Sequence, residues 1–252
     1  MYIETDGAAL NTRHKNDAGS TWRENKLGVA FSPDNIRRWH DKHNERQHRI
    51  QKREYVSFIG PSEEFKKHLL SCALKNGYGL YKKTILISDG ATWIRNIRKE
   101  VFPDALQILD YYHLCENVYT FAKHLFNMNE AKYKPWADKV CKALKKSGYK
   151  DVLNELALYK DKKLAGCQVN LYGYIENNID SIDYANYIKK GYFIGSGAVE
   201  GGNKIILQRR LKQSGMRWNT DSAQSLLTLV SKEESGLWNS EVLRTVFDFF
   251  SR

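Results

Sequence analysis

Apolar and polar positions alternate along the opening residues with the period of two that is typical of a strand. Residues 1–10 place Tyr2, Glu4 and Asp6 on one face of that strand. The same alternation, or a short apolar run, predicts four more strands at 22–32, 55–59, 84–88 and 105–109. Apolar residues at helical spacing predict helices at 61–77 and 91–101.

The order of these elements predicts a mixed sheet. We take the first three strands to be joined by short turns, so we expect an antiparallel meander. The strands at 84–88 and 105–109 each follow a helix, and such crossovers place a strand parallel to the first. Residues 84–88 are also uniformly apolar, as expected of a strand buried on both faces. The pattern therefore predicts an α/β fold whose five-stranded mixed sheet is flanked by helices.

The pattern changes in the middle of the chain. From 116 to about 187 it is helical throughout, without a convincing strand. A helix that carries Glu200 and runs to Leu211 follows, then a turn at 215–218 and a helix around 223–229. An amphipathic segment ends the chain, with apolar positions Leu237, Trp238, Val242, Val246, Phe247 and Phe250. We predict a core (1–115), an all-helical insertion (116–190) and the second part of the core with C-terminal helices (191–252).

A strongly basic segment separates the second and third strands. Residues 33–53 contain Arg37, Arg38, Lys42, Arg46, Arg49, Lys52 and Arg53. Two interpretations stay open for it: a solvated helix and loop, which the composition slightly favours, or an arm that contacts phosphates.

The whole chain is basic. Its 252 residues include 40 Lys and Arg against 29 Asp and Glu, which gives a formal net charge of +11. This balance favours a polyanionic partner, with nucleic acid ahead of an anionic membrane surface; the alternative is a merely soluble basic protein. The hydrophobic share of 42% excludes an intrinsically disordered chain.

Neither structural zinc nor a membrane span is expected. The cysteines form no Cys-x-x-Cys pair, so we expect reduced thiols in a cytosolic compartment. They are Cys72, Cys115, Cys141 and Cys167. No apolar run approaches the roughly 18 residues that span a bilayer, and no signal peptide precedes the first strand. We therefore predict a soluble cytoplasmic protein with no membrane partner.

Three acidic residues stand out by their local settings. Asp6 and Asp89 each end a strand-like run and precede a glycine, which leaves room for backbone or phosphate to approach. Glu200 is followed by five basic residues before the next acid. Carboxylates suit Mg²⁺ or Mn²⁺, and two such ions support phosphodiester chemistry. We predict one catalytic cluster, although a turn-forming role for each aspartate and a helix first-turn role for Glu200 are alternatives.

Five sequence blocks, in order along the chain, resemble those of DDE-type bacterial insertion-sequence transposases. They are YIETDG (2–7), SDGATWI (88–94), LDYYH (109–113), GSGAVEGGN (195–203) and GMRW (215–218). The resemblance implies an RNase H-like fold with the helical insertion between the second and third acids. It also implies that Asp6, Asp89 and Glu200 are the metal-binding triad, holding two Mg²⁺ (or Mn²⁺) ions.

The third block also resembles one found in Mutator-like and hAT-like transposases. That likeness makes His113 a candidate catalytic residue, with a buried hydrogen-bonded ring as the equal alternative. Transposases of this kind usually carry an N-terminal helix-turn-helix domain, whereas this sequence begins at the first catalytic strand. We therefore expect that domain to be lacking, as in a truncated copy.

Residues after Glu200 are the candidate DNA contacts. Lys204 lies one turn beyond Glu200 on the same helix face. The further basic candidates are Arg209, Arg210, Lys212 and Arg217. Trp218 is a candidate for stacking on an unpaired base. A solvated basic face and a core tryptophan are the respective alternatives, and Trp136 in the insertion has the same two interpretations as Trp218.

The function implied by the resemblance is that of a DNA transposase. It would hydrolyse phosphodiesters at insertion-sequence ends and transfer the freed strands to target double-stranded DNA. We expect it to act as a homo-oligomer on DNA and to be nucleoid-associated when bound. The alternatives are a stand-alone metal-dependent nuclease of the same fold and a catalytically inactive, truncated DNA-binding remnant.

Overall fold

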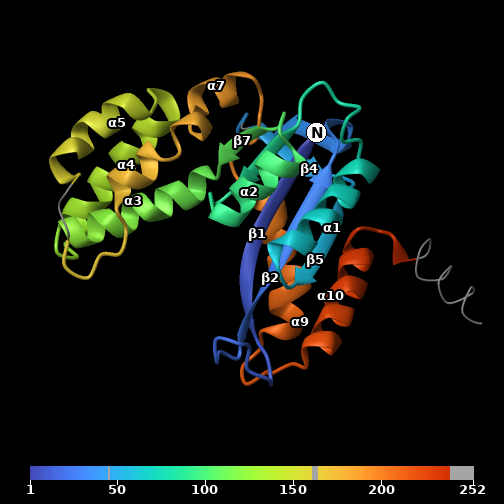
Figure 1. Ribbon diagram of the computed structural model, residues 1–252. Helices are drawn as coiled ribbons and strands as arrows, with labels where there is room; N and C mark the ends of the chain where they lie inside the picture. Colours follow the sequence, from blue (N-terminus) through green and yellow to red (C-terminus); the bar gives the residue numbers. More distant parts are fainter. Residues whose placement is uncertain (45, 161–163, 239–252) are drawn as a thin grey trace, which may run out of the picture. The chain divides into compact units, whose positions relative to one another are not determined.

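A computed structural model describes residues 1–44, 46–160 and 164–238 of the chain (Figure 1). It contains a five-stranded sheet in the order β5-β2-β1-β6-β7. The strands are β1 (Tyr2–Asn11), β2 (Trp22–Phe31), β5 (Glu54–Ile59), β6 (Ile85–Ser88) and β7 (Leu106–Leu109). The predicted α/β class and the five strands are confirmed.

The chain divides into two compact units, and the boundary passes through β6. Unit 1 comprises Met1–Leu86, Trp93–Ala105 and the chain from Gly197 onward. Unit 2 comprises Ile87–Thr92 and Leu106–Ser196. Asp6 and Glu200 therefore belong to unit 1, and Asp89 and His113 to unit 2.

The first three sheet strands form the predicted antiparallel meander. β1 pairs with β2 along its whole length, with Asp6 opposite Leu27, and β2 pairs with β5. One expectation was wrong. Asp6 does not end its strand, because β1 continues to Asn11. A glycine at the next position suggests a strand end, yet Gly7 stays in the ladder opposite Lys26.

Helices of unit 1 pack on both faces of this meander. Gly28 lies under α1 (Ser62–Lys75), since a Cβ there would be 2.4 Å from Leu69 Cδ1. Trp93 of α2 (Thr92–Val101) packs edge-on against Phe65 of α1, with ring centroids 5.8 Å apart. Neighbouring strand residues point to opposite faces. The row that contains Glu4 and Asp6 therefore faces away from α1.

The C-terminal part of unit 1 supplies the helices on that other face. They are α8 (Gly197–Gly202), the π-helical η4 (Asn203–Gln208) and α9 (Arg209–Leu211). The last helix, α10 (Thr220–Glu234), lies along the edge strand β5, where Gln224 bonds to the main chain of Ser57 and Ile59. The predicted helical run through Leu211 and the turn at 215–218 are thus confirmed. The predicted C-terminal amphipathic positions Val242, Val246, Phe247 and Phe250 lie outside the described residues.

The basic segment between β2 and β5 forms a β-ribbon. A short helical turn, η1 (Pro33–Asn35), leads into β3 (Ile36–His40), which pairs antiparallel with β4 (Arg46–Ile50). These two strands form a separate two-stranded sheet. The expected helix and loop was therefore wrong. A ribbon that is solvated on both faces has no apolar row, so its strand period does not show as an alternation of hydrophobicity.

Unit 2 is helical in its described part from Tyr111 to Ser196 (Figure 1). The longer helices are α3 (Tyr111–Leu125), α4 (Glu130–Lys146) and α5 (Tyr149–Leu156). Shorter ones are η2 (Ala157–Tyr159), α6 (Leu171–Glu176), η3 (Ile179–Ser181) and α7 (Tyr184–Lys189). Trp136 packs against Phe121 and Phe126, with ring centroids 6.1 Å from each, which favours a core role over base stacking.

The described part of the chain contains no helix long and apolar enough to cross a bilayer. That agrees with the hydropathy pattern of the sequence.

Candidate functional site

Asp6 projects from the middle of β1 and is half-buried. Its Oδ1 accepts a 2.8 Å hydrogen bond from the main-chain N–H of Gly7, and its Oδ2 accepts a 2.7 Å bond from the side-chain amide of Asn203. Asn203 lies three residues after Glu200 on the same continuous helical run. The structure therefore joins the first and fourth of the sequence blocks through a side-chain contact.

Glu4 strengthens the same junction, and the sequence did not single it out. Its side chain is only 1% exposed. Its Oε2 accepts hydrogen bonds of 2.9 Å from the main-chain N–H groups of Ala198 and Val199, in the first turn of α8. A carboxylate at this position satisfies N–H groups that have no intrahelical partner and complements the positive end of the helix dipole. β1 thus fixes the start of the helix that carries Glu200.

Close packing also holds α8 against the sheet. The hydroxyl of Tyr55 donates a 3.2 Å bond to the carbonyl of Ala198, and burial raises the pKa of Tyr55 to about 12. A Cβ at Gly202 would lie 2.5 Å from Cε1 of Tyr55 and 3.0 Å from Cδ2 of Leu27. Only glycine lets the helix approach the sheet this closely.

The helical geometry changes immediately after Glu200. η4 is π-helical, and the N–H of Arg209 bonds to the carbonyl of Lys204, five residues earlier. π-Helical stretches are rare in proteins, and those that occur are often located at functional sites. Glu200 itself is exposed, whereas Asn203 is 5% exposed. The helical run therefore exposes the carboxylate of Glu200 to solvent and directs the side-chain amide of Asn203 toward Asp6.

Asp89 immediately follows β6, in unit 2, as the sequence predicted. Its Oδ1 accepts a 2.9 Å bond from the N–H of Ala91, and its main-chain carbonyl accepts one of 2.9 Å from the hydroxyl of Tyr174. Gly90 adopts a φ of +83°, which favours glycine. The side chain of Asp89 therefore sits in a tight, well-defined turn.

The two glycines after the aspartates do not leave the open space that the sequence suggested. A Cβ at Gly90 would lie 2.8 Å from Cδ1 of Leu109, and one at Gly7 would lie 2.3 Å from Oε1 of Glu24. Side chains of the protein already fill both positions. Gly90 is favoured by its backbone conformation, whereas the space beside Gly7 is occupied by the flexible end of the Glu24 side chain.

Asp110 is a second buried carboxylate that joins two segments of the chain, both within unit 2. It is 1% exposed, its Oδ1 caps α3 by accepting bonds from the N–H groups of Tyr112 and His113, and its Oδ2 accepts from Ser196. The third and fourth sequence blocks therefore meet at this aspartate. The ring of His113 is not buried: its side chain is 42% exposed, and Nδ1 lies 3.6 Å from Oε2 of Glu116.

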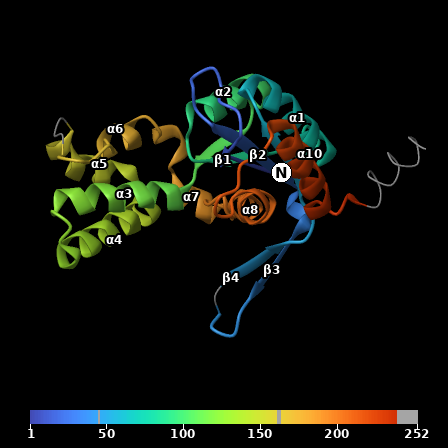
Figure 2. The ribbon, with the colours of Figure 1, turned by 90° about the horizontal axis from the view of Figure 1, so that it is seen from below.

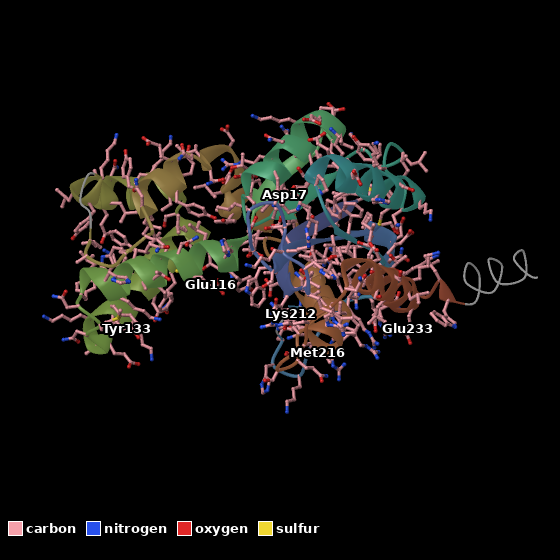
Figure 3. The ribbon with its side chains drawn as sticks, turned by 60° about the horizontal axis from the view of Figure 1, so that its bottom comes forward. Asp17, Glu116, Tyr133, Lys212, Met216 and Glu233 are labelled. Carbon is pink, nitrogen blue, oxygen red and sulfur yellow. The ribbon has the colours of Figure 1, made fainter. Side chains whose placement is uncertain are left out.

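The basic candidates after Glu200 are exposed. They are Lys204, Arg209, Arg210, Lys212 and Arg217. Figure 3 labels Lys212 and Met216 in the segment between α9 and α10. Trp218 is half-buried, its indole N–H donates a 3.1 Å bond to the carbonyl of Leu211, and its main chain pairs beside Thr12 at the end of β1. These contacts favour the packing role for Trp218.

All of these residues fall within a stretch that matches a single protein family, over residues 1–244. The chain belongs to UPF0236, an uncharacterised protein family. A search of curated proteins found no match. The UPF0236 match includes all five sequence blocks, the two capping carboxylates and the basic ribbon of β3 and β4.

Oxygen donors come from β1 and from the α8–η4 run in unit 1. Besides the carboxylates of Asp6 and Glu200, Oδ1 of Asn203 is buried without a hydrogen-bond partner in the described part of the chain. Hard divalent cations take such oxygen ligands, often one or two carboxylates together with water. Among the described residues, no group of three or more His, Cys, Asp and Glu side chains is arranged to hold a metal ion. Unit 1 provides two of the three predicted acids, Asp6 and Glu200, and unit 2 provides the third, Asp89.

Proposed function

We propose that this chain is a DNA transposase with an RNase H-like core, catalysing metal-dependent phosphodiester hydrolysis and strand transfer at insertion-sequence ends. The observation that carries the proposal is the bond from Asn203 to Asp6. It joins two of the blocks that resemble transposases, and no periodicity within either block requires them to meet. The mixed sheet and the helical segment between the second and third acids agree with the fold that the resemblance implies.

In the proposed mechanism Asp6, Asp89 and Glu200 would hold two Mg²⁺ (or Mn²⁺) ions. Such ions, when bound, activate an attacking oxygen and stabilise the leaving one. Glu4 and Asn203 are positioning residues, because they fix the Glu200 helix and the Asp6 carboxylate. His113, half-exposed at the start of α3, is a candidate for proton transfer.

The reaction has two displacements. Water attacks a phosphodiester at the element end, the P–O3′ bond breaks, and the 3′-hydroxyl is released. That hydroxyl then attacks a phosphodiester of the target duplex, forming a new P–O3′ bond and releasing a target 3′-hydroxyl. The exposed basic residues from Lys204 to Arg217 would hold the DNA backbone without reading its sequence. The active form would be a homo-oligomer on DNA, associated with the nucleoid.

The first test is hydrolysis of DNA. Purified protein is incubated with supercoiled plasmid and Mg²⁺, and nicking is followed on gels. Asp6→Asn, Asp89→Asn and Glu200→Gln should each reduce the rate at least about a hundredfold, because each removes a carboxylate that would hold a metal ion. Glu64→Gln, at an exposed position of α1, is the matched control and should leave the rate within about twofold. Unchanged nicking by the three variants would refute the proposed triad.

A second test separates the transposase from the alternatives. Duplexes with pre-cleaved 3′ ends, taken from the DNA flanking the gene, are mixed with a plasmid target. Joined products are expected for a transposase. Nicking without joining would instead identify a nuclease, and DNA binding without either reaction would identify an inactive remnant.

A further inference from the structure

The ribbon of β3 and β4, called the basic ribbon below, lacks the packing that most strands have. It pairs with no third strand among the described residues, and in Figure 2 it extends away from the other strands of unit 1. Its base is fixed by a 2.8 Å bond from the N–H of Gln51 to the carbonyl of Asn35 and by the burial of Ile36. Isolated two-stranded ribbons are marginally stable, so an exposed one of this kind calls for a functional reason.

One cross-strand pair of the basic ribbon is unfavourable for folding alone, because Arg37 lies directly opposite Arg49. Like charges in opposite positions repel and destabilise a ribbon. A polyanion bound along the ribbon would remove this repulsion.

The two faces of the basic ribbon differ in chemistry. Opposite residues share a face, so Arg37, Arg49 and the next pair, Trp39 with Gln47, lie together. Trp39 is 43% exposed, and the amide of Gln47 is held by a 3.0 Å bond to Oδ2 of Asp41. This face therefore combines two guanidinium groups, an amide and an aromatic ring.

A basic groove continues from this face at the foot of the ribbon. Its volume is about 850 Å³, and its lining includes Arg37, Arg49, Lys52 and Arg53 on one side and Glu233 and Glu234 of α10 on the other. In the described part of the chain no ion pair joins Arg37, Arg49 or Lys52 to an acidic side chain. Their charges remain available to a ligand.

We propose that the basic ribbon enters the major groove of duplex DNA with Arg37, Gln47 and Arg49 facing the base edges. The major groove of B-form DNA admits a two-stranded ribbon, arginine bonds bidentately to guanine, and glutamine bonds in the same way to adenine. The groove at the foot of the ribbon then receives the flanking phosphates. This inference rests on the proposed function only in taking duplex DNA as the partner, and it adds a sequence-reading element to it.

Binding is measured with a labelled DNA duplex by fluorescence anisotropy in EDTA, so that catalysis plays no part. Arg37→Gln/Arg49→Gln should weaken binding about 30-fold, since each arginine contact to a base edge is worth about 1 kcal/mol or more. The control Lys67→Gln/Lys99→Gln removes the same charge at exposed positions of α1 and α2 and should cost no more than about threefold. Circular dichroism checks that both variants fold. Equal affinity of the ribbon variant and the unaltered protein would overturn the proposal.

An RNA duplex of the same sequence gives a second, independent measurement. The deep and narrow major groove of A-form RNA does not admit side chains, so RNA should bind at least about tenfold more weakly than DNA. Equal affinity for the two duplexes would exclude major-groove entry and indicate contacts to phosphates alone.

A charge-preserving variant tests the contacts to bases. Arg37→Lys/Arg49→Lys should keep most of the general affinity but lose the sequence preference that the unaltered protein shows when it selects from a pool of randomised duplexes, because lysine lacks the bidentate fork. The same preference in both proteins, or none in the unaltered protein, would contradict base reading. The proposed catalytic function fails separately, if Glu200→Gln retains nicking activity while these binding results stand.

Discussion

The side-chain amide of Asn203 donates a 2.7 Å hydrogen bond to Oδ2 of Asp6, across 197 positions of sequence. The other amide atom, Oδ1, is buried without a hydrogen-bond partner in the described residues. A buried acceptor of this kind is costly unless water or a ligand satisfies it. The amide of Asn203 therefore holds the carboxylate of Asp6 in place and carries a second buried oxygen, Oδ1.

Replacing Asn203 should separate positioning from folding. In Asn203→Ala the carboxylate of Asp6 loses its fixed orientation, and we expect Mg²⁺-dependent plasmid nicking to fall at least about tenfold. The Mg²⁺ concentration for half-maximal rate should rise as well. Gln208→Ala, at an exposed position of the same helical run, is the control and should leave both quantities unchanged. A lower melting temperature with normal kinetics would show that Asn203 has only a structural role.

Glu4 should contribute strongly to stability although it is charged and buried. Glu4→Ala leaves two N–H groups of α8 without their acceptor and should lower the free energy of unfolding by about 3 kcal/mol. Glu4→Gln keeps one acceptor oxygen and should cost less, about 1–2 kcal/mol. Urea denaturation measures both. Glu64→Ala, an exposed first-turn acid of α1, is the control and should change stability by less than about 1 kcal/mol.

Two adjacent glycines in α8 offer a matched comparison. A methyl group at Gly202 would overlap Tyr55 and Leu27, whereas at Gly201 it would meet no atom within 4 Å. Gly202→Ala should therefore destabilise unit 1 by about 1–3 kcal/mol through overpacking. Gly201→Ala should be neutral or stabilising by up to about 1 kcal/mol, because alanine favours helix. Similar melting temperatures for the two variants would show that the helix does not pack this closely on the sheet.

The raised pKa of Tyr55 predicts a loss of folding stability at alkaline pH. Burial raises its pKa from 10.0 to about 12 in the folded chain. Between these values the unfolded chain releases the phenolic proton while the folded chain keeps it, so stability falls as pH rises. The loss attributable to Tyr55 reaches about 2–3 kcal/mol near pH 12. In Tyr55→Phe the decline between pH 10 and 12 should be shallower than in the unaltered protein, as measured by urea denaturation at each pH. If stability declines equally in the two proteins, Tyr55 is not the cause of the decline.

Local periodicity predicted most of the regular elements. β2, β5 and α1 agree with their predicted ranges to within about two residues, since each has one buried face or stripe that repeats at its own period. The basic ribbon escaped prediction because arginines occupy both of its faces. The continuation of β1 past Asp6 was not predicted either. The side chain that fills the space beside Gly7 is that of Glu24, which comes from another strand.

The sequence by itself determined the five strands of the main sheet, the helical character of the middle of the chain, the basic charge and the acidic residues that stand out at Asp6, Asp89 and Glu200. Only the tertiary structure decided that Glu4 and Asp110 are buried acceptors, and that Asn203 reaches Asp6. The physical reason is the range of the interactions. A helical or strand period depends on neighbours a few residues apart, whereas a buried carboxylate is stable only where folding brings distant N–H donors to it.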